Sequence, residues 1–109
     1  MSDLAGFVAA RLDEAAVRAT MREIHASSCE SVPSEGYYTF PCDCGVPERM
    51  GREVDAKRKI LARYEEIFAE RKKHPEDLAV AGALLALHGV VCALAAIWCD
   101  HPDYDPAWA

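Results

Sequence analysis

The sequence lacks the basic excess that nucleic-acid-binding domains carry. It has 12 lysines and arginines against 18 acidic residues, which gives a formal net charge of −6. Neutralising a phosphate backbone requires a concentrated basic face. The two short basic runs, AKRKI and ERKKH, stand among carboxylates and are typical of solvated helix faces. We therefore expect no nucleic-acid partner.

The common motifs of enzyme chemistry are missing as well. The sequence has no glycine-rich phosphate loop, no paired catalytic carboxylates and no cofactor fingerprint. A cysteine nucleophile needs a base and an orienting group in a cleft, and only Cys29 near His25 meets the first of these needs. We expect a non-enzymatic interaction or accessory module. The alternative is a cysteine-based redox protein or other enzyme that uses Cys29, Cys42 and Cys44.

The N-terminal segment MSDLAGF has neither the basic region nor the apolar stretch of a signal peptide. The sequence contains 5 cysteines, an odd number. Both features predict a cytoplasmic protein with reduced cysteines. A length of 109 residues, of which 51% are hydrophobic, suits a single helical domain over residues 1–109.

Helical periodicity is present in three segments. Apolar residues recur at steps of three and four within 3–25, 47–73 and 76–100, with a loop at 26–46 and a tail at 101–109. The fold class predicted is all-α: a three-helix bundle with an irregular loop between the first two helices and an extended aromatic C-terminal tail. The apolar stripe of the second helix consists of Met50, Val54, Leu61, Tyr64 and Phe68.

The third helical segment lacks formal charge for 22 residues, from Leu78 to Cys99. At about 1.5 Å per residue this length reaches about 33 Å, enough to cross a bilayer core. The first two helices each carry an apolar stripe that the third can cover. We therefore favour a soluble bundle with the third helix at its centre. The alternative is a single membrane span over 78–99.

Two faces of this segment differ in side-chain size. Large side chains form a ridge, which consists of Leu84, Leu87, Val91, Leu94 and Trp98. Small side chains follow alternating steps of three and four and form the small-residue seam, which consists of Ala79, Gly82, Ala86, Gly89, Ala93 and Ala96. The apolar stripes of the first two helices can cover the ridge, but they leave the seam exposed on the outer side of the bundle. Because long apolar strips on soluble proteins mark interfaces, we expect a homodimer through the seam.

The loop between the first two helices combines ligands that zinc prefers. His25 and Cys29 stand four residues apart at one end, and Cys42 and Cys44 stand beside Gly45 at the other. Two ligand pairs separated by about a dozen residues are the general form of a structural zinc site. The spacing predicts zinc bound by His25, Cys29, Cys42 and Cys44. Two alternatives remain open: an iron–sulfur or redox use of these cysteines, and cysteines that merely tolerate a turn-rich loop.

Two further groups carry candidate chemistry. His88, Cys92 and Cys99 share one helix face, which we interpret as core packing. A second metal-site hypothesis combines Cys42 or Cys44 with His88 and Cys92. In the tail CDHPDYDPAWA, Pro102 and Pro106 force an extended path. Tyr104 and Trp108 then provide two aromatic anchors. We expect them to fold back on the bundle, with partner binding as the alternative.

Three segments resemble a known family. DLAGFVAARLDE, REVDAKRKIL and DHPDYDPAW are similar to the signatures of an uncharacterised family of small acidic proteins from actinobacteria and their phages, classed as a domain of unknown function. The resemblance implies a soluble intracellular protein whose last helix leads into a fixed C-terminal tail. It implies no catalytic residue. This sequence departs from its relatives in the last helix, where they often have a basic residue and this chain has only apolar residues and His88.

Overall fold

The computed structural model describes residues 3–18 and 46–109. Three α-helices make up these residues: α1 (Asp3–Arg18), α2 (Val46–Lys73) and α3 (Leu78–Ala95). Two single 3₁₀ turns follow, η1 (Ala96–Trp98) and η2 (Pro106–Trp108). The described ranges contain no strand, so the predicted all-α three-helix bundle is confirmed. The predicted continuation of the first helix to residue 25, and the loop after it, lie outside the described residues.

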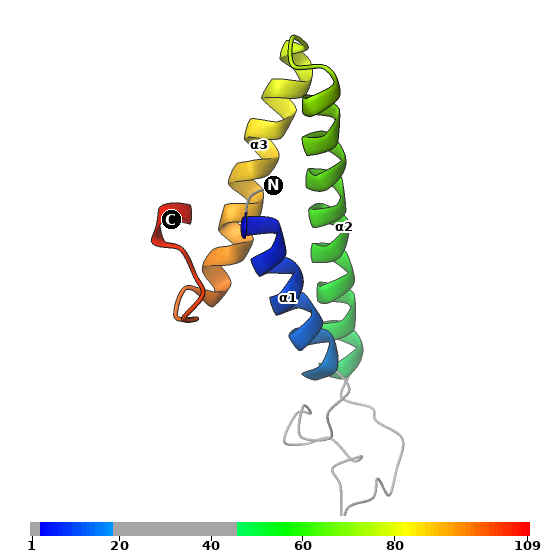
Figure 1. The fold of residues 1–109 in the computed structure, drawn as a ribbon. Helices are drawn as coiled ribbons and strands as arrows, with labels where there is room; N and C mark the ends of the chain where they lie inside the picture. The colour runs from blue at the N-terminus through cyan, green and yellow to red at the C-terminus, as the bar shows by residue number, and fades with distance from the viewer. Residues whose placement is uncertain (1–2, 19–45) are drawn as a thin grey trace, which may run out of the picture.

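Helices α2 and α3 form a long antiparallel hairpin, and α1 lies against its lower half (Figure 1). α1 has 16 residues and α2 has 28, so α1 cannot cover the whole hairpin. The upper half therefore has two helices where the lower half has three. The chain after α3 turns back and runs beside α3, so this lower half is also the thicker part of the molecule (Figure 1).

Apolar residues at helical spacing build the core between the three helices. α1 buries Leu4, Phe7, Val8 and Leu12, α2 buries Val54, Leu61 and Tyr64, and α3 buries Val91 and Ala95. The predicted stripe of α2 is buried or half-buried at each of its five positions. Burying such side chains contributes about 1.5–3 kcal/mol each, before the entropy of ordering them is subtracted. On the exposed side, Arg58 donates to Asp13 at 2.9 Å and links α2 to α1, a surface pair that stabilises little.

The third helix begins two residues later than predicted. Asp77 has an extended backbone (φ −79°, ψ 108°), and its carboxylate accepts hydrogen bonds from Ala79 N at 3.0 Å and Val80 N at 3.2 Å. An acid that caps a helix in this way stands outside the helix and satisfies two of its free N–H groups. Glu76 and Asp77 thus belong to the turn, and Leu78 is the first helical residue.

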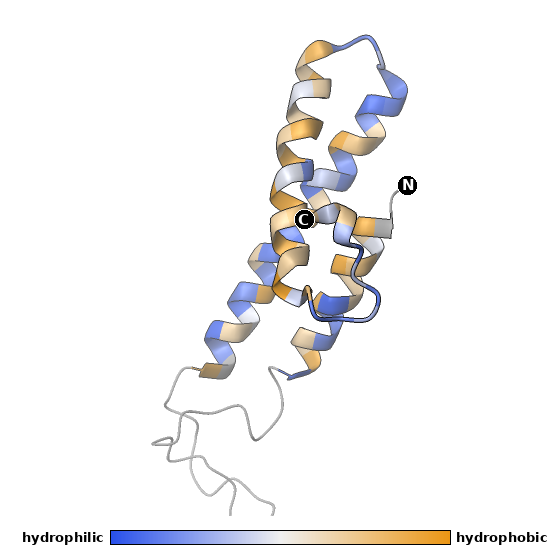
Figure 2. Cartoon of the chain, turned by 90° about the vertical axis from the view of Figure 1, so that its left-hand side faces the viewer, coloured by the Kyte–Doolittle hydropathy of each residue, from blue (hydrophilic) through white to orange (hydrophobic). Residues whose placement is uncertain are grey.

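The third helix is not the buried centre of the bundle, contrary to expectation. The stretch Leu78–Trp98 is apolar, and over its most apolar part the mean hydropathy is 2.3 while only 11% of that part is buried. By length and composition alone it could cross a membrane. The large ridge is buried or half-buried against α1 and α2, whereas all six residues of the small-residue seam are exposed. Two neighbouring helices can cover only one side of a third helix, and α1 lies along only the lower half of α3 (Figure 2).

Candidate functional site

The C-terminal tail follows a defined path back along α3. His101 N donates to Trp98 O at 2.9 Å, and Tyr104 N donates to His101 O at 3.0 Å, which makes two successive turns. Asp105 then caps η2, because its carboxylate accepts from Ala107 N at 2.9 Å. These bonds, together with the two prolines, set the direction in which Tyr104 and Trp108 leave the chain.

The tail packs against Phe7 of α1. Its ring centroid lies 6.5 Å from Trp98, 5.6 Å from His101, 6.0 Å from Tyr104 and 5.2 Å from Trp108. Tyr104 and Trp108 also contact each other edge to face at 5.5 Å. Such aromatic pairs stabilise by about 0.5–1.5 kcal/mol each beyond the area they bury. We call this cluster, with the arginine described next, the clasp: Phe7, Arg11, Trp98, His101, Tyr104 and Trp108.

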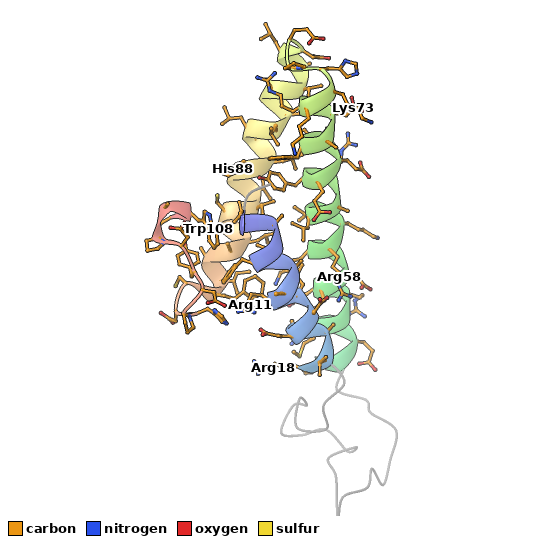
Figure 3. The ribbon with its side chains drawn as sticks, in the orientation of Figure 1. Arg11, Arg18, Arg58, Lys73, His88 and Trp108 are labelled. Carbon is orange, nitrogen blue, oxygen red and sulfur yellow. The ribbon has the colours of Figure 1, made fainter. Side chains whose placement is uncertain are left out.

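Arg11 adds a buried charge to the clasp. It is 9% exposed, and its guanidinium carbon lies 5.3 Å from the centre of the Phe7 ring. Its Nη1 contacts His101 Nε2, and its Nε lies 3.1 Å from Glu14 Oε2. A planar guanidinium suits this place because it stacks on an aromatic face while it pairs at its rim. Arg11 therefore ties α1 to the turn that starts the tail (Figure 3).

The sequence contained a signal for the clasp on its α1 side. Phe7 and Arg11 stand four residues apart on the same helix face as Leu4, Val8 and Leu12. An arginine on an otherwise apolar stripe needs a partner when buried. The signal indicated that Arg11 meets a polar group, but nothing in the sequence named His101 as that group.

The outward face of α3 carries the small-residue seam. All six seam residues are exposed. The seam is bordered by large apolar side chains that are also exposed: Leu78 (85%), Leu85 (75%), Val90 (43%) and Ile97 (55%). A methyl group added at Gly82 or Gly89 would meet nothing within 4 Å. The chain's own packing thus gives no reason for these two glycines, each of which costs the helix about 1 kcal/mol relative to alanine.

Two open grooves border this face and meet at His88. The first, of about 360 Å³, lies between α2 and α3 and is lined by Tyr64, Phe68, Leu84, Leu85 and His88. The second, of about 480 Å³, lies between α3 and the end of the tail. Its α3 wall consists of His88, Gly89, Cys92, Ala93 and Ala96, and its tail wall consists of Ala107, Trp108 and Ala109. The tail therefore stands beside the lower half of the seam and forms one side of a groove.

His88 links two other side chains between these grooves. The Tyr64 hydroxyl lies 3.2 Å from His88 Nδ1, and Cys92 Sγ lies 3.5 Å from His88 Nε2. Burial raises the pKa of the Cys92 thiol. A nucleophilic cysteine requires the opposite shift, because the thiolate is the reactive form. The arrangement therefore does not favour a cysteine nucleophile at Cys92.

The structure brings together only part of the predicted metal ligands. His25, Cys29, Cys42 and Cys44 lie outside the described residues. Within residues 3–18 and 46–109, no group of three or more histidine, cysteine or acidic side chains could hold a metal ion. His88 and Cys92 do meet, whereas Cys99 contacts Asp100 at 4.0 Å, seven residues further along the chain.

The described elements define a small all-α protein in which a helical hairpin, supported by a short first helix, carries an aromatic C-terminal clasp. The chain belongs to a family described as Family of unknown function (DUF6221), whose model matches residues 1–109. The predicted membership of an uncharacterised family is thus confirmed, while the actinobacterial source and the three signature segments stay predictions. No curated protein and no solved structure matches the chain.

Proposed function

We propose that the protein is a non-enzymatic interaction module that associates with a second copy of itself through the outward face of α3. The observation that carries this proposal is the exposure of the whole small-residue seam together with Leu78, Leu85, Val90 and Ile97. These residues form an apolar strip along the helix, without a formal charge. Strips of this kind on soluble proteins mark interaction surfaces.

A protein partner explains both the size and the shape of this strip. Covering apolar surface contributes about 25 cal/mol per Å² removed from water. The exposed glycines and alanines permit another helix to approach closely, while the bordering leucine, valine and isoleucine side chains fill the space on either side. Gly82 and Gly89, which cost the free helix stability, acquire a role at such a contact.

A membrane span over 78–99 is the second candidate, and its supporting observation is that only 11% of the most apolar part of this stretch is buried. The position of α2 argues against it. α2 lies alongside α3 and is hydrophilic on its outer side (Figure 2), with the exposed pair Arg63–Glu66 and three basic residues in its last turn. Placing α3 in lipid would bring these charges into the bilayer or separate the two helices. We therefore propose a soluble, cytoplasmic protein.

Self-association is tested by light scattering at tens of micromolar protein. The unmodified chain should have about twice the monomer mass of 12.0 kDa. Ala86→Glu should give the monomer mass, because it places an unpaired charge in the contact. Ala62→Glu on α2 is the matched control, since this alanine is also exposed and helical, and it should leave the dimer intact. A monomeric unmodified chain would refute the proposal, and recovery only with membranes would establish the span instead.

We also propose that the loop binds one structural zinc ion through His25, Cys29, Cys42 and Cys44. The support is the spacing of the two ligand pairs. Protein purified without added metal should contain one zinc per chain, and the three thiols of Cys29, Cys42 and Cys44 should become reactive only after chelation. Free reactivity of the loop cysteines without chelator, together with metal-free protein, would contradict this. Reversible disulfide formation among Cys29, Cys42 and Cys44 would favour the redox alternative.

A further inference from the structure

We infer that the dimer is antiparallel, with its two-fold axis level with the midpoint between Leu87 and His88 along α3. Leu85 of each protomer sits in the groove between α3 and the C-terminal tail of the other protomer. The inference rests on the proposed self-association and specifies its geometry. It assigns the clasp a second role: besides stabilising its own chain, it holds the tail as one wall of a socket for the second copy.

The small-residue seam is symmetric about this axis. Its steps of three and four are the repeat of a two-helix coiled coil. Counted from the midpoint between Leu87 and His88, the seam residues fall in pairs at equal distances on either side: Ala86 with Gly89, Gly82 with Ala93, and Ala79 with Ala96. An antiparallel dimer therefore stacks three kinds of layer, each made of two small residues. Every layer permits the same close approach of the helices.

The shape of the protomer selects the antiparallel orientation over the parallel one. The lower half carries α1 and the tail, while the upper half is the α2–α3 hairpin alone (Figure 1). A parallel pair would place two tails against each other at the thick end and leave the thin ends apart. In the antiparallel pair, each thick end meets the thin end of the other copy. The antiparallel arrangement also opposes the two helix dipoles.

Leu85 has a matching socket in this arrangement. It precedes the seam residue Ala86, just as Cys92 precedes the seam residue Ala93. Positions that precede seam residues lie on one edge of the coiled coil, and in an antiparallel pair these edges face each other. Leu85, which is 75% exposed, thus comes opposite Cys92 of the second copy. Cys92 lines the groove of about 480 Å³ whose other wall is Ala107–Ala109.

The area of the contact between the two α3 helices indicates why the tail is needed. α3 has 18 residues, so the helix contact is about 27 Å long and about 10 Å wide. Two such strips have a combined area of roughly 540 Å², which is below the roughly 1,000 Å² that a specific interface needs. The contact of Leu85 with the tail, made twice in the dimer, adds to this area.

Disulfide cross-linking tests the orientation. We use two variants, Gly82→Cys and Ala93→Cys, in a background where Cys92 and Cys99 are replaced by alanine. An equilibrated mixture should form a cross-link between position 82 of one chain and position 93 of the other upon mild oxidation, because disulfides require Cα atoms within about 7 Å. Each variant alone should form few dimers, since the two copies of its new cysteine stand 11 residues apart along the antiparallel pair, or about 16 Å. Peptide mapping excludes links from the loop cysteines.

The socket is tested separately by Leu85→Cys in the chain that retains Cys92. We expect an interchain disulfide between positions 85 and 92 and none between two copies of position 85. Efficient linking within each single variant of the first pair would establish a parallel dimer and overturn the inference. A chain of dimeric mass with no seam cross-link overturns it while leaving self-association in place, and a monomeric mass refutes both. An 82–93 link without an 85–92 link overturns the placement of Leu85.

Discussion

Replacing Phe7 by alanine is expected to lower the free energy of unfolding by about 3–5 kcal/mol, the range for removing a buried aromatic side chain. Phe7 is 8% exposed and contacts four aromatic rings of the C-terminal region. Its loss leaves Trp98, Tyr104 and Trp108 without their common surface. The tail should then separate from α1, in addition to the general loss of stability.

Tryptophan fluorescence measures the two effects together. The chain has 2 tryptophans, Trp98 and Trp108, and both contact Phe7, so the emission reports on the clasp. Phe7→Ala should shift it toward longer wavelength already without denaturant. Phe68→Ala is the matched control, since Phe68 is a half-buried phenylalanine on α2 that contacts Tyr64. It should destabilise less and leave the native emission unchanged. An unchanged native emission in Phe7→Ala would show that the tail is held by other contacts.

Tyr64→Ala is expected to have an effect of similar size, about 3–5 kcal/mol. Tyr64 is 1% exposed and is the largest fully buried side chain of the described core. It contacts Phe68 and His88, with ring centroids 6.1 Å away in each case. A cavity at this place weakens the packing between α2 and α3.

Tyr64→Phe separates packing from hydrogen bonding at the same position. It removes only the hydroxyl that lies 3.2 Å from His88 Nδ1. Since His88 is exposed, water can replace this partner, and we expect a loss of less than about 1 kcal/mol. Urea unfolding of both variants at one fixed protein concentration measures the difference, because self-association makes stability depend on concentration. Equal losses in the two variants would show that the hydroxyl, rather than the ring, holds α3 in place.

These predictions concern one connected piece of the molecule. The clasp fixes the tail, the tail forms one wall of a groove on α3, and the same helix face carries the small-residue seam. If Leu85 of each protomer sits against the tail of the other, a change at Phe7 should also weaken the dimer, although Phe7 lies away from the seam. Light scattering on Phe7→Ala, at a concentration where the variant remains folded, should therefore give a mass below that of the unmodified dimer.

The sequence by itself determined which segments are helices and which faces of them are apolar. The stripe from Met50 to Phe68 and the large ridge of α3 are local patterns with the period of a helix, and a local pattern is legible without a structure. It also distinguished the seam from the ridge, because side-chain size follows directly from residue type. The end of α2 at Lys73 is equally local, since a proline follows two residues later.

Only the tertiary structure decided how much of α3 is covered and where the tail lies. Apolar character shows that a helix face can be buried, but its coverage depends on the length and position of the neighbouring helices. α1 ends short of the upper hairpin, so α3 keeps an open face instead of becoming the centre of a bundle. The contact of Arg11 with His101 joins positions 90 residues apart in the chain. Such a pair results from the path of the backbone through two turns and a helix packing angle, which no short stretch of sequence specifies.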